Sequence, residues 1–299
     1  MDKKIRRDFH DEISKNKVKT FFLIALFIIF IGVLGVAVSY ILSGTFSFGI
    51  MTFAGIIAII YALVGYYSGD KIVLASTRAT KADPVKYIHL HNVVEGLAMA
   101  AGIPKPNVYI VNDPSPNAFA TGRDPEHASV AVTTGLLKTL NREELEGVIA
   151  HEMSHVQNQD IKIMTLVTVL FGIITVVSDI ALRSMFFSGG RSKGNKSSIL
   201  IVVALVLVVL SPIIGLVIQM TISRNREYLA DSNGAKLTRY PQGLANALKK
   251  IANLNIPTKT ATKGTAHLYI SNPVSVKKVS GLFSTHPPIE ERIKRLESM

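Results

Sequence analysis

A glutamate lies between two histidines in the stretch His151-Glu152-Met153-Ser154-His155. Helix positions four residues apart share a face, so His151 and His155 can both direct an imidazole nitrogen at one tetrahedral zinc ion. Glu152 is one step further round the helix, from which a carboxylate reaches a water molecule at the metal and not the metal itself. This HExxH spacing is typical of zinc peptidases, and the alternative is a chance arrangement of these residues.

A third ligand is needed, because a catalytic zinc takes three protein ligands and keeps one position open. The chain has no cysteine, so this ligand must be a carboxylate or another histidine. A helix predicted from Arg224 to about Thr238 carries Glu227 and Asp231 four residues apart and therefore on one face. Glu227 would bind the metal and Asp231 would accept the ring N–H of a bound histidine. Alternatively, both carboxylates lie on a solvated helix face beside Arg226.

The helix that positions the two histidines is predicted from Asn141 to Asp160. Asn141 and Glu144 occupy the N-cap and N3 positions of a capping box, and an apolar stripe follows them. An amphipathic helix is predicted before it, at residues 84–101. Three short strands that could form one small sheet are predicted at residues 107–111, 117–122 and 129–133.

The C-terminal part predicts two further helices, one from Pro241 to about Leu254 and one from Pro287 to the chain end. Ser284 or Thr285 would cap the last helix, with proline in its first turn. Residues 255–280 are polar and predict a surface loop, and His267 within it is expected to be solvated.

The composition indicates a membrane protein. The 299 residues are 48% hydrophobic and 18% charged, with a mean hydropathy of +0.33, so the apolar residues must be gathered in blocks. Four apolar runs are each about long enough to cross a bilayer as a helix, at residues 20–42, 49–67, 161–182 and 199–220. We therefore expect a mainly α membrane protein with four transmembrane helices. Its net charge of +12 suits a lipid bilayer as partner, and we expect no nucleic acid partner.

Four motifs together resemble the HtpX-type membrane-bound zinc metalloproteases, which are related to the CaaX prenyl proteases. They are the HExxH stretch, the Glu-x-x-x-Asp of Glu227 and Asp231, the stretch from Asn117 to Gly122, and Phe283-Ser284-Thr285-His286-Pro287. The resemblance covers essentially the whole chain, with the apolar runs in the same order. It implies a zincin-like α+β metalloprotease domain with a small β-sheet.

The resemblance also implies roles for single residues. It implies one Zn²⁺ per chain, with His151, His155 and Glu227 as ligands, Glu152 as general base and Asp231 as acceptor for a ligand imidazole. His286 would stabilise the oxyanion, and its alternative is a surface residue at a helix start. An extended peptide would add to an edge strand through main-chain bonds, and the alternative for that stretch is a turn after a proline-rich loop. The substrate-binding residues would be Asn117, Ala118, Phe119 and Ala120.

The apolar runs divide the chain into five parts: a basic cytoplasmic tail (1–19), a transmembrane hairpin (20–68), a first part of the protease domain (69–160), a second hairpin (161–222) and a second part of the protease domain (223–299). The positive-inside rule predicts that both termini and the protease domain are cytoplasmic. The loop between the third and fourth runs conflicts with this rule, because it has four basic residues and no acidic one. Either the second hairpin crosses fully, which we favour, or it enters the bilayer only partly.

The expected function is that of a zinc-dependent endopeptidase in the cell membrane of a prokaryote. By resemblance, it cleaves misfolded or damaged membrane and membrane-proximal proteins at the cytoplasmic face. One alternative is an intramembrane site-2-type protease, although residues 141–144 are too polar to enter the bilayer core. The other alternative is a catalytically silent zinc-binding membrane scaffold.

Overall fold

A computed structural model describes residues 18–33, 36, 39, 45–170, 172, 224–254, 256–262, 264–271 and 287–299. The fourth apolar run, the loop before it and His286 lie outside the described residues, as do Ser284 and Thr285. The third apolar run is described only as far as residue 170, apart from residue 172. The chain is mainly helical and contains one small mixed sheet.

The sheet has four strands in the order β1-β2-β4-β3. They are β1 (Thr80–Lys81), β2 (Asn107–Val111), β3 (Ala118–Gly122) and β4 (Ala128–Thr133). β2 and β4 are parallel, whereas β1 pairs antiparallel with β2, and β3 antiparallel with β4. The three strands predicted from the sequence are confirmed, and the two-residue β1 was not predicted. β3, which contains most of the predicted substrate-binding stretch, is an edge strand of this sheet.

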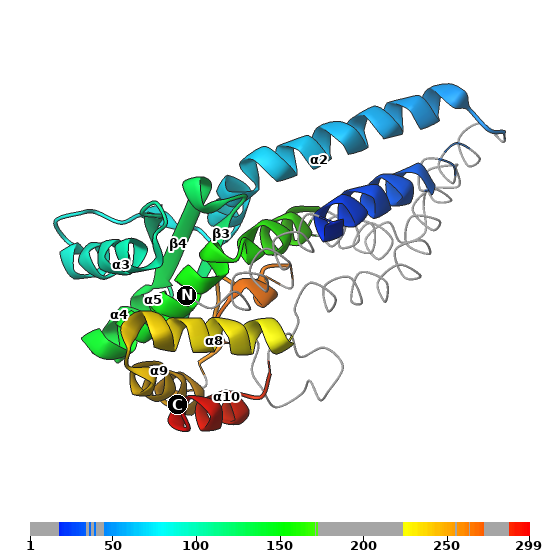
Figure 1. The fold of residues 1–299 in the computed structure, drawn as a ribbon. Helices are drawn as coiled ribbons and strands as arrows, with labels where there is room; N and C mark the ends of the chain where they lie inside the picture. The colour runs from blue at the N-terminus through cyan, green and yellow to red at the C-terminus, as the bar shows by residue number, and fades with distance from the viewer. Residues whose placement is uncertain are drawn as a thin grey trace, which may run out of the picture.

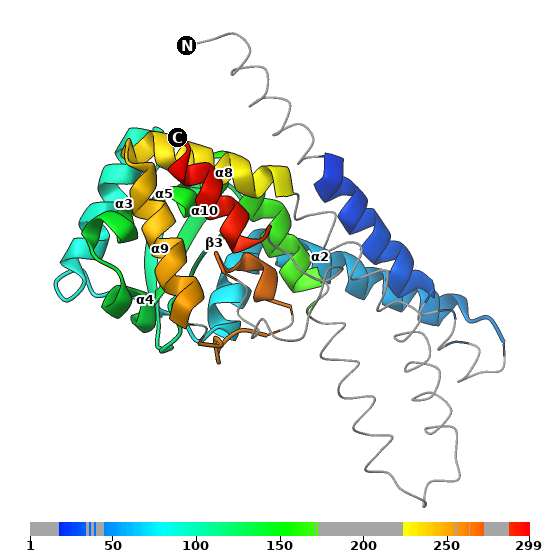
Figure 2. The same cartoon turned by 90° about the horizontal axis from the view of Figure 1, so that it is seen from below.

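Helices pack around the sheet and around one central helix, α5 (Figures 1 and 2). The described helices of this domain are α3 (Ile88–Ala101), α4 (Thr134–Thr139), α5 (Arg142–Gln157), α8 (Arg224–Thr238), α9 (Pro241–Leu254) and α10 (Ile289–Glu297). Short 3-10 turns are η1 (Pro125–His127) and η2 (Ala266–Leu268). The predicted capping box is confirmed, because Asn141 Oδ1 accepts from Glu144 N and Glu144 Oε2 accepts from Asn141 N, each at 2.9 Å.

The helix that carries the HExxH motif is shorter than predicted. α5 ends at Gln157, and Gln159 has a left-handed backbone conformation with φ 57°. Helical structure then resumes over residues 160–170. This break matters for the site, because it turns the side chain of Asp160 back toward His155.

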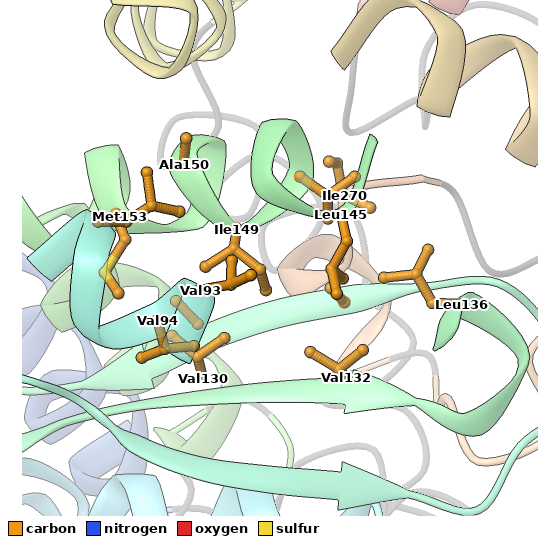
Figure 3. Packing of buried hydrophobic residues seen from close by; sticks show 14 of the residues in the cluster. Val93, Val94, Val130, Val132, Leu136, Leu145, Ile149, Ala150, Met153 and Ile270 are labelled. Atoms are coloured by element: carbon orange, nitrogen blue, oxygen red, sulfur yellow. The ribbon is translucent and has the colours of Figure 1, made fainter. Parts of the chain in front are cut away.

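α5 is buried between the sheet and the C-terminal helices. Ile149 and Met153 on α5 belong to one apolar core with Val130 and Val132 of β4 (Figure 3). On the other side, Gly147 lies against α9, since a Cβ added there would be 2.6 Å from Leu244 N.

α8 approaches α5 in the same way. A Cβ added to Gly234 would be 3.0 Å from His151 N. Glycine at this position therefore lets α8 bring its carboxylates up to the histidines of α5.

One helix among the described residues, α2 (Phe48–Ser76), is long and apolar enough to cross a membrane. A shorter apolar helix, Val18–Val33, lies beside it, and both project from one end of the domain (Figures 1 and 2). α2 includes the second predicted run and continues past Asp70 to Ser76. Its outer face exposes large apolar side chains, Phe48 and Phe53 among them, which suits contact with lipid.

The prediction of a solvated loop at residues 255–280 is wrong for residues 267–270, whereas residues 256, 257, 259 and 262 are exposed. Leu268, Tyr269 and Ile270 are almost fully buried, and so is His267. The buried His267 ring has buried partners: Nε2 lies 3.2 Å from both Met164 O and Thr168 Oγ1. A polar composition therefore did not mean exposure, because buried partners replace water.

Candidate active site

His151 and His155 on α5 and Glu227 on α8 form a group that could hold a metal ion. Each residue offers one ligand atom, and these atoms all lie within 4.8 Å of one another. All three side chains are buried, with at most 4% exposed. The tertiary structure thus brings the third predicted ligand to the two histidines across 72 residues of sequence (227 minus 155).

The hydrogen bonds of the two imidazoles fit a metal site. His151 Nδ1 lies 2.9 Å from Asp231 Oδ1, and His155 Nδ1 lies 3.1 Å from Asp160 Oδ2. A carboxylate accepts, so each Nδ1 donates its proton and each Nε2 is the nitrogen that presents a lone pair to a metal once the imidazole is neutral. The two Nε2 atoms are 3.2 Å apart, and Glu227 Oε1 is 3.5 Å from Nε2 of His155. Two lone pairs and a carboxylate facing one point suit a zinc ion with an open fourth position.

Asp231 lies where the sequence predicted, and its solvated-face alternative is wrong, because Glu227, Asp231 and Arg226 are all buried. Arg292 of α10 holds it with two hydrogen bonds, from Nε to Oδ2 at 2.9 Å and from Nη2 to Oδ1 at 2.7 Å. Burial raises the pKa of Asp231, but the Arg292 guanidinium and the His151 hydrogen bond outweigh burial and lower it to about 2. The carboxylate is therefore ionised, as an acceptor for His151 must be.

Sequence reasoning missed Arg292, although a signal was present. Positions 289, 292, 293 and 296 have the spacing of one buried helix face, and three of them are apolar. An arginine within such a stripe is expected to be buried with an acidic partner.

Asp160 was also missed as a functional residue. It accepts from His155, and its other oxygen lies 3.2 Å from Arg226 Nε. Burial lowers the pKa of His155, but the Asp160 hydrogen bond and the charge of Glu227 outweigh burial and raise it to about 9. Burial lowers the pKa of His151. Asp160 lies five residues after His155, past the helix end, so no periodic pattern in the sequence pointed to it.

Glu152 is buried beside the three possible ligands. Burial raises its pKa to about 7, and the negative charge of Glu227 adds to this effect. The charge of His155 and a hydrogen bond from the backbone N–H of Ala120 act in the opposite direction. A carboxyl whose pKa lies near neutrality can both accept and return a proton.

The predicted substrate-binding residues Asn117, Ala118, Phe119 and Ala120 are buried at the open edge of the sheet. Ala118 O accepts from Ile270 N at 3.0 Å, and the Phe119 ring lies edge-on to Tyr269 at 5.0 Å. The edge is therefore next to Glu152 at one point and next to the chain's own residue 270 at another.

Comparison with known proteins identifies the family. Residues 84–299 match the model of Peptidase family M48. The chain belongs to peptidase family M48. It is similar to proteins named "Protease HtpX homolog" from Caldanaerobacter subterraneus subsp. tengcongensis, at 49% identity over 98% of this chain and 99% of that protein, and from Ligilactobacillus salivarius, at 42% identity over 97% and 99%.

Among solved structures, the crystal structure of S. mikatae Ste24p matches with a TM-score of 0.51 and 20% identity, over 96% of this chain and 67% of that chain. At this identity the match shows a likeness of fold. Membership of family M48 confirms the resemblance drawn from the four sequence motifs. The chain is a membrane metalloprotease, and its substrates are polypeptides.

Proposed function

We propose that this M48 member is a zinc-dependent endopeptidase of a prokaryotic cell membrane that cleaves misfolded or damaged membrane and membrane-proximal proteins at the cytoplasmic face. One observation carries the chemistry: three buried ligand atoms, from His151, His155 and Glu227, converge beside the buried carboxyl of Glu152. Each histidine in this group is oriented by a buried carboxylate, which is typical of metal sites.

In this proposal His151, His155 and Glu227 hold one Zn²⁺. Bound zinc supplies a lowered pKa for water and polarises the scissile carbonyl. Glu152 takes the proton from the attacking water and passes it to the leaving amine, for which a pKa of about 7 is suited. His286 is the proposed donor to the developing oxyanion, and it lies outside the described residues.

The substrate is proposed to bind as an extended strand along Asn117 to Ala120. The N–H of Ala120 already contacts Glu152, so a peptide beside β3 would lie next to the general base. Main-chain pairing depends little on the side chains of the substrate, which suits an enzyme that accepts many unfolded polypeptides.

We propose the membrane topology expected from the sequence: four crossings, with both termini and the two parts of the protease domain (69–160 and 223–299) in the cytoplasm. Two observations support a site near the bilayer. Residues 160–170 begin five residues after His155, and Gly69 of α2 packs against Thr165, since a Cβ there would be 2.8 Å from Thr165 Cγ2. Substrates that emerge from the membrane would therefore reach the site first.

The test is proteolysis of a detergent-solubilised membrane protein by the purified chain, first stripped of metal and then supplied with zinc. We expect zinc-dependent cleavage that is lost in Glu152→Gln with zinc still bound. Glu227→Ala should lose cleavage and zinc affinity together, whereas Glu290→Gln, which changes an exposed glutamate, should change neither. If the wild-type chain binds zinc but cleaves no protein, the scaffold alternative replaces the protease.

A further inference from the structure

The open edge of β3 is the side that faces away from β4. Asn117 O accepts from Thr133 N of β4, so residues 117, 119 and 121 direct their amides at β4, and residues 118, 120 and 122 direct theirs at the open side. On that side the N–H of Ala120 donates to Glu152, and Gly122 N donates to Thr165 Oγ1 at 3.0 Å. The carbonyl of Ala118 accepts from Ile270 N at 3.0 Å.

Asn117, which precedes β3, continues this pairing through its side chain. Asn117 Nδ2 donates to Ser271 O at 3.0 Å, and Asn117 Oδ1 accepts from Ser271 N at 3.3 Å. The carboxamide therefore binds both main-chain groups of one residue, as a neighbouring strand would. Residues 270 and 271 are thus held by the edge through their backbone, which is how a peptide of any sequence would be held.

The same segment contacts the metal centre. Arg292 Nη1 donates to Ile270 O at 3.0 Å, while its other nitrogens bind Asp231, the acceptor for His151. Both main-chain groups of Ile270 are therefore bound, the N–H by the edge strand and the carbonyl by a residue that also supports a ligand histidine.

The side chains of Tyr269 and Ile270 pack in two different apolar clusters. Ile270 packs into the core formed with α5, where Figure 3 shows it beside Leu145. Tyr269 packs in a different apolar cluster with Phe119. Pairing of main-chain groups with the edge and an apolar side chain held in the core are what a bound peptide would show here.

We propose that residues 269–271 are an internal peptide that fills the substrate position, so that a substrate must displace them from β3 before it is cleaved. This inference rests on the proposed function and adds its regulation. An internal competitor acts at an effective concentration of roughly millimolar, which keeps dilute folded proteins out and admits long unfolded chains that bind at many points.

The preceding residues give this peptide a fixed tether. Asp113 is buried, and its Oδ2 accepts from Thr260 N at 2.9 Å and from Thr260 Oγ1 at 3.0 Å. Thr258 Oγ1 lies 2.9 Å from Ser115 Oγ. These bonds do not involve β3, so they can persist while residues 269–271 leave the edge and return.

The test compares two deletions of equal size in the same core. Ile270→Ala removes the apolar anchor of the internal peptide, and Ile251→Ala on α9 removes an equally large, buried side chain away from β3. With zinc-loaded protein in detergent and fluorescein-labelled casein, we expect Ile270→Ala to lower KM roughly 10-fold, as follows when a site that is about 90% self-occupied becomes free. Ile251→Ala should lower the melting temperature without lowering KM. Equal behaviour of the two variants would overturn the proposal.

A second variant covers the case in which Ile270→Ala does not fold. Ser271→Pro deletes the N–H that donates to Asn117, at a half-buried position that does not belong to the apolar core. It should also lower KM, and an unchanged KM would overturn the proposal.

A readout without cleavage separates this inference from the proposed function. In zinc-loaded Glu152→Gln, hydrogen exchange at the amides of Ile270 and Ser271 should accelerate when casein is added. If wild type cleaves casein but neither exchange nor KM responds, only the internal peptide is rejected. If neither wild type nor the edge variants show zinc-dependent cleavage, the proposed function is rejected.

Discussion

Arg292 donates two hydrogen bonds to Asp231, at 2.7 and 2.9 Å, although the two residues are 61 positions apart in the sequence. Because Asp231 also reaches His151 Nδ1 at 2.9 Å, the guanidinium fixes the orientation of one proposed zinc ligand, and its Nη1 lies 3.8 Å from Oε2 of another, Glu227. A buried arginine also neutralises part of the negative charge that Glu227, Asp231 and Glu152 bring together.

Replacement of this arginine should weaken the metal site. Arg292→Lys keeps the positive charge but loses the planar pair of donors, so Asp231 would be held less rigidly. We expect zinc affinity to fall roughly 10- to 100-fold, measured by competition with a chelator. Arg295→Lys, one turn away on the same helix and exposed, is the matched control and should keep wild-type affinity. Equal affinities for both variants would contradict a positioning role.

Asp160 should be as important to His155 as Asp231 is to His151. Asp160→Asn keeps the size of the side chain but removes its charge, so we expect zinc affinity to fall roughly 10- to 100-fold. Asp83→Asn removes the charge of an exposed aspartate that bonds the backbone N–H groups of Val85 and Lys86, and should leave zinc binding unchanged. Loss of affinity in both variants would point to a general effect of charge.

The close approach of α9 to α5 predicts a steric effect at Gly147. An alanine Cβ would lie 2.6 Å from Leu244 N, so the two backbones must separate, at an expected cost of about 1–3 kcal/mol. At Gly96 on α3 nothing lies within 4 Å, and Gly96→Ala should stabilise by up to about 1 kcal/mol. Thermal unfolding in detergent, followed by circular dichroism, compares the two variants, and a neutral Gly147→Ala would show that the helices separate freely.

Zinc uptake should release a proton from His155. In the metal-free protein the Asp160 hydrogen bond and the charge of Glu227 outweigh burial and raise its pKa to about 9, so the imidazole is charged at neutral pH. A ligand imidazole must be neutral, so zinc affinity should fall as pH drops below about 9, by roughly tenfold per unit for one displaced proton. Calorimetry in two buffers of different ionisation enthalpy measures that proton. Asp160→Asn should lower the pKa and shift this dependence to lower pH, and an affinity independent of pH would contradict the argument.

Much of the fold could be predicted because it depends on local patterns. The capping box at Asn141 and the strands β2, β3 and β4 follow from neighbouring residues, and each was found where expected. The prediction of a solvated loop at 255–280 was wrong for its buried residues, since a polar composition does not show which threonines and histidines have buried partners. Asp160 was missed because its contact with His155 follows no local period. The apolar stripe around Arg292 predicts its burial, but only the tertiary structure shows that its partner is Asp231.

The sequence by itself determined the pair of histidines on one helix face, with a glutamate beside them, because helix geometry fixes the relation between positions four apart. It also determined the family, through four motifs in a fixed order. Only the tertiary structure decided that Asp160 and Arg292 support the two histidines, and which segment fills the edge of β3. Those contacts join residues 61 positions apart, for Asp231 and Arg292, and 154 apart, for Asn117 and Ser271. Such pairs are set by how whole helices and the sheet pack together, which local sequence does not specify.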